Sequence, residues 1–385
     1  TGDALTKTKH TDFKSALAGK VAGVQVISGT SSTYEPSAIR LRGETDVLYV
    51  VDGIKVSSTD INTDNIDNIT VLKGAAATAL YGSEAKSGVI VITSKKAKAG
   101  ESYISVDHNT TVSNVSRLHP YQNEYGGGYY QDWDQFAYNP ATDPASWAAF
   151  NGQNIPYYAA DESWGPKLDG TLARHWDSWI PGHPEFGTTR PWSANPNNVK
   201  DFFATGVKSI NSIAVSKGGE NYTSRFSYTN NTTTGIMPTS KLESHNFNGR
   251  ASFDLNDKLS VDFKGTYFTQ SIDGRVETGG EGAIPVVYQI PRNVDVNDLK
   301  VWQKANPSSD ADYRVINATR LGAAGRANPY WMLENDIDRE KRARFFGFAN
   351  INYEWFSKNY INLVSWYENI SSSKLFLDIM IKNKK

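Results

Sequence analysis

The chain has 385 residues, a formal net charge of −1 and no cysteine. It is long enough for two or more domains, and the lack of cysteine excludes disulfide frameworks, thiol nucleophiles and cysteine-based metal sites. The near-neutral charge gives no basic surface for nucleic acid, and no run of eighteen apolar residues predicts a transmembrane helix. The mean hydropathy of −0.50 is typical of soluble proteins, but membrane strands that alternate lipid-facing and lumen-facing residues give similar values.

The N-terminal part of the chain has the pattern of a small α/β unit. Thr11 or Asp12 can cap a short helix that runs to about Gly19. The alanine-rich residues 75–80 predict a second helix, which Tyr81-Gly82 ends because glycine tolerates the left-handed cap conformation. Three short apolar runs, the first closed by an Asp-Gly turn, predict buried strands at 48–51, 69–72 and 89–93.

Beyond a linker at 97–100, apolar and polar residues alternate, which predicts strands with two different faces. The predicted strands are 103–115, 209–217, 222–230, 245–255, 259–267, 345–353 and 360–367. Long connections alternate with short turns, and the long ones are about 116–206, 231–244 and 270–341. Outer-membrane barrels have short periplasmic turns and long outer loops. This parity therefore indicates such a barrel, with its first strand running outward.

Two neighbouring strands alternate most regularly and define the faces of the predicted barrel wall. The residues expected to face lipid are Phe247, Ala251, Phe253, Val261, Phe263 and Tyr267. The residues expected to face the lumen are Arg250, Asp254, Asp262 and Lys264. A charge on the lipid face costs about 2–4 kcal/mol near the midplane. Phe253→Arg should therefore impair barrel assembly, whereas Asp262→Asn should be tolerated.

Several motifs in the N-terminal part, in one fixed order, resemble a known family. IRLRG, LYVVDG and the segment from Ile66 to Lys96 are similar to the plug domain of SusC-like TonB-dependent outer-membrane transporters. The plug motif residues are Arg40, Arg42, Gly43, Asp52, Gly53, Lys73, Gly74, Tyr81, Gly82 and Gly88. Further similarity covers 16–26, 162–170, 202–206, 328–331 and 344–347, and it fades after about Asn369.

The resemblance implies a transmembrane antiparallel β-barrel with an N-terminal α/β plug domain inside its lumen. The plug is expected at 1–98 and the N-terminal part of the barrel at 99–385. Barrels of this class have about 22 strands, and the region after the plug has room for seven or eight strands of roughly ten residues. We therefore expect the barrel to be incomplete here, and we find no TonB-binding box before the plug.

The family further implies active import of a nutrient, either an oligosaccharide (glycan) or a peptide, across the bacterial outer membrane. Its members work in outer-membrane lipid with a SusD-like surface lipoprotein as a lid. TonB couples import to the energy of the inner membrane. A dimer of transporter–lipoprotein pairs is also implied, and no nucleic acid is expected as a partner. The sequence leaves open whether the substrate is a glycan or a peptide.

No catalytic, cofactor or metal site is recognised, and the protein is expected not to be an enzyme. Six scattered histidines form neither a zinc motif nor a close cluster. The acidic pair Asp132 and Asp134 has nothing that sets a glycosidase separation, and no EF-hand spacing predicts calcium. The glycine run Gly126–Gly128 lacks the Lys-Ser/Thr of a phosphate-binding loop and is interpreted as a loop.

The first long connection holds most of the tryptophans. Aromatic faces there can stack on sugars or pack on peptide side chains, or they can build the packed loop or an aromatic girdle. The candidate substrate-binding residues are Trp133, Trp164, Tyr129, Tyr130 and Trp176. Trp133 and Trp164 are favoured because charged neighbours flank each ring. We expect this connection to be ordered, with one part contacting the lid and another lining the substrate cavity.

Two alternatives remain open. One is a siderophore-type or cobalamin-type TonB-dependent receptor that works without a lid; a stoichiometric lipoprotein partner would argue against it. The other is a soluble β-rich carbohydrate-binding protein or enzyme, which would stay monomeric without detergent.

Overall fold

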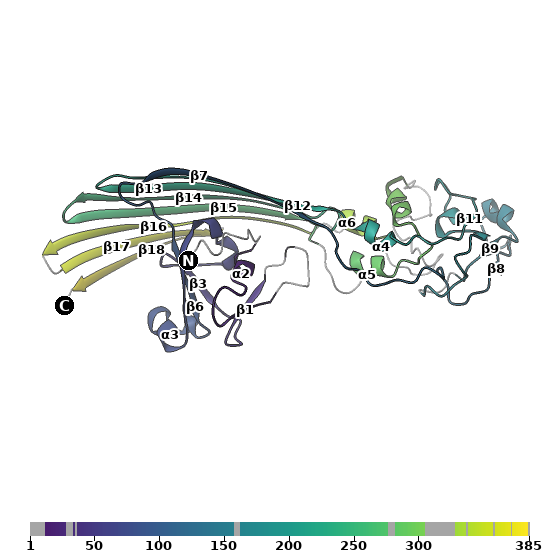
Figure 1. Cartoon of the computed structure of the whole chain (residues 1–385), viewed down its shortest axis with the longest axis horizontal. Helices are drawn as coiled ribbons and strands as arrows, with labels where there is room; N and C mark the ends of the chain where they lie inside the picture. Colours follow the sequence, from purple (N-terminus) through teal and green to yellow (C-terminus); the bar gives the residue numbers. More distant parts are fainter. Residues whose placement is uncertain are drawn as a thin grey trace.

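The computed structural model describes residues 12–27, 34, 37–157, 162–275, 282–304, 328–335, 338–356, 359–370 and 372–383, with the backbone alone from residue 355 onward. Three parts are visible in Figure 1. The N-terminal unit, up to residue 98, lies against one face of a long sheet, which we call the large sheet. The distal lobe lies beyond one end of this sheet and comprises residues 114–205, 282–304 and 328–335.

The N-terminal unit is built from short elements. They are α2 (Phe13–Ala16), β1 (Val24–Ile27), β2 (Ala38–Leu41), β3 (Leu48–Val51), β4 (Ile54–Val56), η1 (Ser58–Asp60), η2 (Thr63–Asn65), β5 (Ile66–Leu72), α3 (Ala75–Tyr81), η3 (Ser83–Ala85) and β6 (Val89–Ser94). Four strands form a sheet in the order β4-β3-β6-β5, with β3 and β6 parallel, while β1 pairs with β2. The predicted strands are confirmed as β3, β5 and β6, and the predicted second helix as α3. Strands β2 and β4 were not predicted, whereas β1 lies at the end of the stretch 16–26, whose resemblance implied a helix followed by a strand.

Local chemistry sets the ends of the two helices. The Asp12 carboxylate accepts hydrogen bonds from the backbone N–H groups of Lys14 and Ser15, at 2.9 and 3.1 Å, as an N-cap should. This helix ends at Ala16 rather than near Gly19, so the predicted length is wrong. Helix α3 ends at Tyr81-Gly82 as predicted, but Gly82 has φ of +72° and ψ of −162°, so it does not adopt the left-handed cap conformation that was expected.

The large sheet is antiparallel throughout. Its strands are β7 (Ser102–Ser113), β12 (Gly206–Gly218), β13 (Tyr222–Thr234), β14 (Lys241–Asn256), β15 (Leu259–Asp273), β16 (Arg339–Phe356), β17 (Asn359–Ile370) and β18 (Ser372–Asn383). The order β18-β17-β16-β15-β14-β13-β12-β7 is simple hairpin succession, and within the described residues the sheet is open, with β7 and β18 at its edges. All seven predicted strands are confirmed with shifted bounds, and β18 was not predicted.

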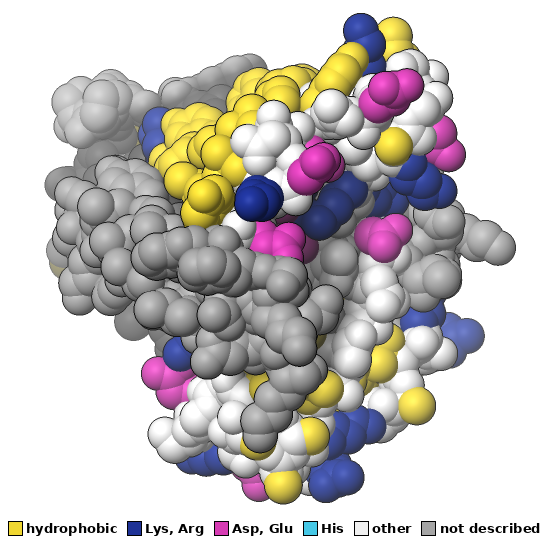
Figure 2. Space-filling view, turned by 90° about the vertical axis from the view of Figure 1, so that its left-hand side faces the viewer, with side chains coloured by type: hydrophobic (Ala, Val, Ile, Leu, Met, Phe, Trp, Pro, Cys, Tyr) yellow, Lys and Arg dark blue, Asp and Glu magenta, His cyan; other side chains and the backbone are white. Residues whose placement is uncertain are grey.

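The two faces of the large sheet differ as the alternation predicts. On the outer face, Phe247, Phe263 and Tyr267 remain 43–48% exposed. On the inner face, which meets the N-terminal unit, Arg250 and Lys264 are only 8% and 6% exposed. Figure 2 shows hydrophobic side chains gathered along the upper, outer surface of the sheet, with charged groups below them. The register keeps this pattern across neighbouring strands.

One predicted long connection is wrong. The segment 231–244 is mostly strand, because β13 and β14 continue to pair from Asn231 with Ser244 up to Thr234 with Lys241. The connection between them is the six-residue segment 235–240. Both faces of these strand segments carry polar residues, so the alternation of apolar and polar residues that predicts a strand is absent there. The other two long connections are observed at 114–205 and 274–338, and all three connections lie at the same end of the sheet.

The distal lobe joins both long connections in one folded body. Its elements are β8 (Asp134–Gln135), η4 (Ala145–Phe150), β9 (Asn154–Ile155), β10 (Leu172–Ala173), η5 (Trp176–Trp179), β11 (Arg190–Pro191), α4 (Asn198–Phe202), α5 (Ala283–Tyr288), η6 (Val296–Lys304) and α6 (Pro329–Asn335). Its apolar core contains Trp176 and Phe202 from the first connection, Val287 and Leu299 from the second, and Met237 from the short one. Among the described residues, no helix is both long and apolar enough to cross a membrane.

Candidate functional site

The contact between the N-terminal unit and the inner face of the large sheet is the candidate functional site. A two-residue turn, Asp52-Gly53, joins β3 to β4. Both residues have positive φ, +49° and +91°, as the type I′ turn of a tight hairpin requires. The turn places the Asp52 carboxylate at the surface that meets the sheet, where it contacts Lys264.

Four charged side chains form a buried ion network across this contact. Lys264 Nζ lies 2.5 Å from Asp52 Oδ2, and Arg250 Nη1 lies 3.5 Å from the same oxygen. Arg250 also binds Asp262 in a bidentate pair at 2.6 and 3.1 Å. The side chains of Lys264, Asp52 and Arg250 are 3–8% exposed. Two cations thus face two carboxylates, which compensates charges that would be costly to bury alone.

Ser94, at the end of β6, completes the network. Its backbone N–H donates to Asp52 Oδ1 at 3.0 Å, and its hydroxyl donates to Asp52 Oδ2. Burial favours the neutral acid, but the Lys264 ammonium and the Ser94 hydrogen bonds outweigh it, so the pKa of Asp52 lies below its ordinary value. Asp52 is therefore a carboxylate at neutral pH.

The network alters one expectation about Asp262. The sequence predicts that Asp262→Asn is tolerated, but Asp262 is the bidentate partner of Arg250, a buried cation. Loss of the carboxylate leaves Arg250 with less compensating charge. The structure therefore argues that this substitution is costly.

Amide and hydroxyl side chains, together with the Asp64 carboxylate, make a second line of contacts between η1–η2 and the sheet. Asn62 Nδ2 donates to Thr229 Oγ1 at 2.9 Å. Ser212 donates to Asp64 at 2.5 Å, and Ser227 donates to Asn65 at 2.8 Å. These contacts cover strands β12 and β13, while the ion network covers β14 and β15. The N-terminal unit is thereby attached across four adjacent strands.

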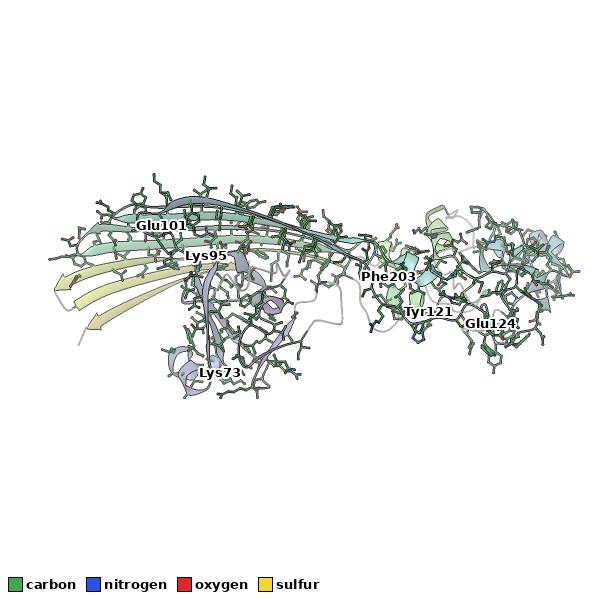
Figure 3. The ribbon with its side chains drawn as sticks, in the orientation of Figure 1. Lys73, Lys95, Glu101, Tyr121, Glu124 and Phe203 are labelled. Carbon is green, nitrogen blue, oxygen red and sulfur yellow. The ribbon has the colours of Figure 1, made fainter. Side chains whose placement is uncertain are left out.

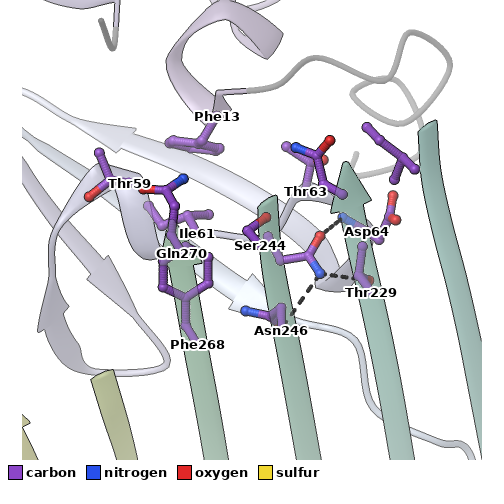
Figure 4. A pocket seen from close by; sticks show the side chains of 13 residues that line it. Phe13, Thr59, Ile61, Thr63, Asp64, Thr229, Ser244, Asn246, Phe268 and Gln270 are labelled. Carbon is purple, nitrogen blue, oxygen red and sulfur yellow. Dashed lines mark hydrogen bonds between the residues drawn. The ribbon is translucent and has the colours of Figure 1, made fainter. Parts of the chain in front are cut away.

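A pocket lies between this second line of contacts and α2. Figure 4 shows its lining from both parts of the molecule. The lining residues are Phe13, Thr59, Ile61, Asn62, Thr63, Asp64, Ile210, Thr229, Asn231, Ser244, Asn246, Phe268 and Gln270. Its wall is therefore shared between the N-terminal unit and strands β12 to β15.

The apolar core of the N-terminal unit also reaches the sheet. Its larger cluster includes Phe13, Leu17, Ile54 and Ile92 together with Phe346 of β16. Because one cluster holds side chains from both parts, the N-terminal unit buries some of its apolar surface only when it is docked.

Two other plug motif residues, Lys73 and Gly88, serve the N-terminal unit itself. Lys73 lies on the side away from the large sheet (Figure 3) and its Nζ donates to the Ala22 carbonyl at 3.0 Å. Gly88 has φ of +114°, and a Cβ there would lie 2.9 Å from Leu41 Cδ1, so a side chain is excluded. Asp52 is the motif residue that forms the ion pairs described above.

In the distal lobe, the glycine run and the 162–170 motif form one structure. Gly128 N–H donates to the Glu162 carbonyl, and Trp164 N–H donates to the Gly128 carbonyl, at 2.9 and 3.0 Å. A Cβ on Gly165 would lie 2.2 Å from the Gly127 carbonyl oxygen, so the two backbones touch. The interpretation of the run as a loop stands, and close backbone approach is the physical reason for its glycines.

Buried charge crosslinks the two long connections of the lobe. Arg190 pairs with the fully buried Asp177 and reaches Asp298, from the second connection, at 3.3 Å. Next to this cluster, burial lowers the pKa of His175 to about 4, and the Arg190 cation acts in the same direction. Burial raises the pKa of Asp177, although Arg190 opposes the shift. His175 is therefore neutral in the folded lobe at neutral pH.

The five candidate substrate residues take different positions in the lobe. Tyr129, Tyr130 and Trp164 are 62%, 36% and 53% exposed. Trp133 is partly buried, with its ring edge-on to Trp192 at 5.4 Å. Trp176 is 4% exposed and belongs to the apolar core, which favours a packing role over substrate contact. The structure thus gathers three of the five on the surface.

The sequence predicts the residues of the ion network but not the pairs that they form. It placed Arg250 and Lys264 on the inner face and Asp52 in a motif, but nothing in the sequence joins positions about two hundred residues apart. The pocket residue Asn246 was also missed. The strand alternation, which puts Asn246 on the same inner face as Arg250, is the pattern that could have identified it. Among the described residues, no group of three or more His, Cys, Asp or Glu side chains is placed to hold a metal ion.

Comparison with known proteins gives a consistent result. Residues 1–89 match the family described as the TonB-dependent Receptor Plug Domain. The chain is 26% identical over 383 residues to the TonB-dependent receptor SusC of Bacteroides thetaiotaomicron, covering 92% of this chain and 33% of that protein. It is 33% identical over 141 residues to TonB-dependent receptor P39 of Formosa agariphila, covering 35% of this chain and 13% of that protein. The chain thus spans about a third of the length of SusC.

Solved structures show the same fold. The RagAB peptide importer in its closed-closed state matches with a TM-score of 0.63 and 18% identity, covering 96% of this chain and 40% of that one. A structure of the RagAB peptide transporter matches with a TM-score of 0.60 and 17% identity, over the same shares of the two chains. In these comparisons the N-terminal unit corresponds to a plug domain and the large sheet to part of a barrel wall.

Proposed function

We propose that this chain, which belongs to the SusC-like TonB-dependent transporters, works in energy-coupled import of a nutrient across the bacterial outer membrane. The N-terminal unit is the plug and the large sheet is part of the barrel wall. The observation that carries the proposal is the buried ion network between Asp52, Lys264, Arg250 and Asp262. It holds the plug against the wall, so passage of a substrate requires the plug to move.

Energy for that movement comes from TonB. No ATP is available at the outer membrane, so work must be delivered mechanically from the inner membrane. A pull on the chain before Asp12 reaches α2 and β1 first, before the four-stranded sheet of the plug. Phe13 of α2 and Leu17, which directly follows α2, belong to the plug core, so their withdrawal would loosen the cluster that also contains Phe346.

The distal lobe supplies the outer surface for substrate and partner. We propose that it contacts a SusD-like surface lipoprotein, as the RagAB name implies a second component for that importer. The exposed aromatics Tyr129, Tyr130 and Trp164 are placed for contact with that partner or with the substrate. A rigid lobe suits this task, because a preorganised surface loses little entropy on binding.

The substrate class proposed is an oligosaccharide or a peptide, and the location is the outer membrane. The test is uptake by cells of the native host that carry or lack this gene, with and without functional TonB. Labelled oligosaccharides and labelled peptides are supplied separately. We expect uptake of one class to require both the gene and TonB. Uptake that is unchanged by deletion of the gene, or independent of TonB, would contradict the proposal.

A matched assay addresses the partner. Gentle solubilisation of native membranes, followed by purification on the transporter, should yield a lipoprotein at one copy per transporter. Its consistent absence would rule out the lid.

A further inference from the structure

We propose that the pocket between η1–η2 of the plug and strands β12–β15 is a binding site for one uncharged, hydroxyl-rich ring of the substrate. This inference rests on the proposed import function and deepens it by naming a site and a ligand chemistry. The pocket is distinct from the exposed aromatics of the distal lobe, since its residues come from the plug and the inner face of the wall.

The lining has the chemistry of a neutral polar site. Of the thirteen residues, four carry amides and four carry hydroxyls. Asp64 is the single ionisable side chain among them, and it already accepts a hydrogen bond from Ser212 at 2.5 Å. Amide and hydroxyl groups match sugar hydroxyls, because each both donates and accepts hydrogen bonds. None of the thirteen lining side chains is a cation that could pair with an anionic ligand, and the neighbouring Arg342 already donates to Thr59 and Gln270.

One buried donor in this lining has no partner. Asn246 is 5% exposed, and among the described residues its Nδ2 has no hydrogen-bond partner, although its Oδ1 accepts from Asn62 Nδ2 at 3.5 Å. Buried polar groups in folded proteins are nearly always paired, so an unpaired one at a pocket wall points to a ligand acceptor. A hydroxyl oxygen of the bound ring would supply that acceptor.

Two aromatic side chains, both mostly buried, add an apolar element to the pocket, and the Arg342 guanidinium lies over one of the two rings. Phe13 of α2 and Phe268 of β15 belong to the lining (Figure 4). The apolar C–H face of a sugar ring can stack on an aromatic ring while its hydroxyls bind polar groups at the edge. The combination of amides, hydroxyls and aromatic rings therefore favours a neutral sugar over an ion or a purely apolar group.

The pocket is also linked to plug movement. Phe13 is the second described residue of the chain and belongs to α2, the first element that a pull on the N-terminus would displace. Because the pocket has one wall on the plug and one on the sheet, displacement of α2 removes part of the site. A ring bound there would be released as the plug opens, which couples transport work to release.

The test uses the full-length transporter purified in detergent, with equilibrium binding measured on three probe sets. These are neutral hexasaccharides (malto-, xylo-, manno- and laminari-), acidic oligogalacturonides and uncharged capped tripeptides. We expect a neutral hexasaccharide to bind and Asn246→Leu, which keeps the volume but removes the donor, to weaken it at least tenfold. Asn248→Leu is the matched control, because the Asn248 amide already donates to Thr266 at 2.6 Å and lies outside this pocket.

A second variant tests the same pocket in case Asn246→Leu fails to fold. Ser244→Trp fills the pocket from β14 without removing any hydrogen bond described for the Ser244 side chain, and it should abolish the same binding. Thermal melting identifies any variant that fails to fold. Failure of every neutral probe to bind, preference for the acidic or peptide probes, or unchanged affinity in the folded pocket variants would overturn the proposal. Because binding needs no TonB, these outcomes are separate from failure of uptake in cells.

Discussion

The plug–wall contact and the distal lobe are held together by different chemistry. The plug meets the wall largely through ions, amides and hydroxyls. The apolar part of this contact is smaller and includes Phe346 of β16. The lobe instead has its own apolar core and aromatic ring contacts, such as Trp147 edge-to-face with Trp179 at 5.0 Å between ring centres. A polar contact can be replaced by water when it opens, whereas an apolar core cannot without a large penalty. We infer that a contact made mostly of polar groups suits the part that must move, whereas an apolar core crosslinked by a few buried ion pairs holds the lobe together.

The largest expected effect is in the lobe core. Trp176→Ala should destabilise the lobe by about 3–5 kcal/mol, because it removes a buried aromatic ring and leaves a cavity. Native-state hydrogen exchange of lobe amides measures this opening free energy. The control is Trp164→Ala, where the ring is 53% exposed, with an expected change within about 0.5 kcal/mol. Equal losses in the two variants would contradict the assignment of Trp176 to the core.

The next effect is at the ion network. Lys264→Met leaves the buried Asp52 without its closest cation and should weaken plug docking by about 3–5 kcal/mol. Exchange of β3 and β4 amides in the full-length protein reports on docking. Lys55→Met is the control, because Lys55 pairs with Glu84 where both are well exposed and such pairs contribute about 0–1 kcal/mol. Unchanged protection in Lys264→Met would show that the network does not hold the plug.

On the outer face, Phe247→Arg should destabilise the assembled barrel by about 2–4 kcal/mol if the position lies near the membrane midplane. Phe253→Arg, three residues before the end of β14, should cost less, because the penalty falls toward the interfaces. The folded fraction in outer-membrane preparations is the measurement. Asp254→Asn serves as the control, and equal assembly of all three variants would exclude a lipid-facing surface here.

The smallest effect is a pH dependence of the lobe. The pKa of His175 is lowered to about 4 in the folded lobe, so the unfolded lobe binds a proton first as the pH falls through 6.5. Stability from this group is therefore present above pH 6.5 and is lost progressively toward pH 4, by roughly 1–2 kcal/mol within the window from pH 7 to pH 5. Hydrogen exchange between pH 7 and 5 should show the loss.

His175→Gln is the variant that isolates this group. It should flatten the pH dependence in that window while wild type retains its slope. Asp177 and Asp298 have raised pKa values, caused first by burial. Their protonation on acidification acts in the opposite direction, so the comparison is best kept above pH 5. A slope identical in wild type and variant would contradict the assignment.

The sequence predicts most strands of the molecule and the two faces of the large sheet, because the alternation of apolar and polar residues depends only on neighbouring positions in the chain. Phe247 and Arg250 occupy odd and even positions along β14, so their side chains point to opposite sides. This alternation is enough to assign the outer and inner faces of the large sheet. The extent of β13 and β14 could not be predicted, since residues such as Thr232 and Asn231 are polar on both faces and only their pairing makes them strand. The same limit applies to the site: Asp52 and Lys264 meet through tertiary contact, which no local pattern contains.

The most direct test of the central claim is a double-mutant cycle at Asp52 and Lys264. Plug docking is measured by hydrogen exchange of β3–β4 amides in the wild type, Asp52→Asn, Lys264→Met and the double variant, all as full-length protein. If the ion network holds the plug, the two single losses are not additive, and the double variant recovers a coupling of about 0.5–3 kcal/mol. Additive losses would show that Asp52 and Lys264 act independently, and would contradict the account.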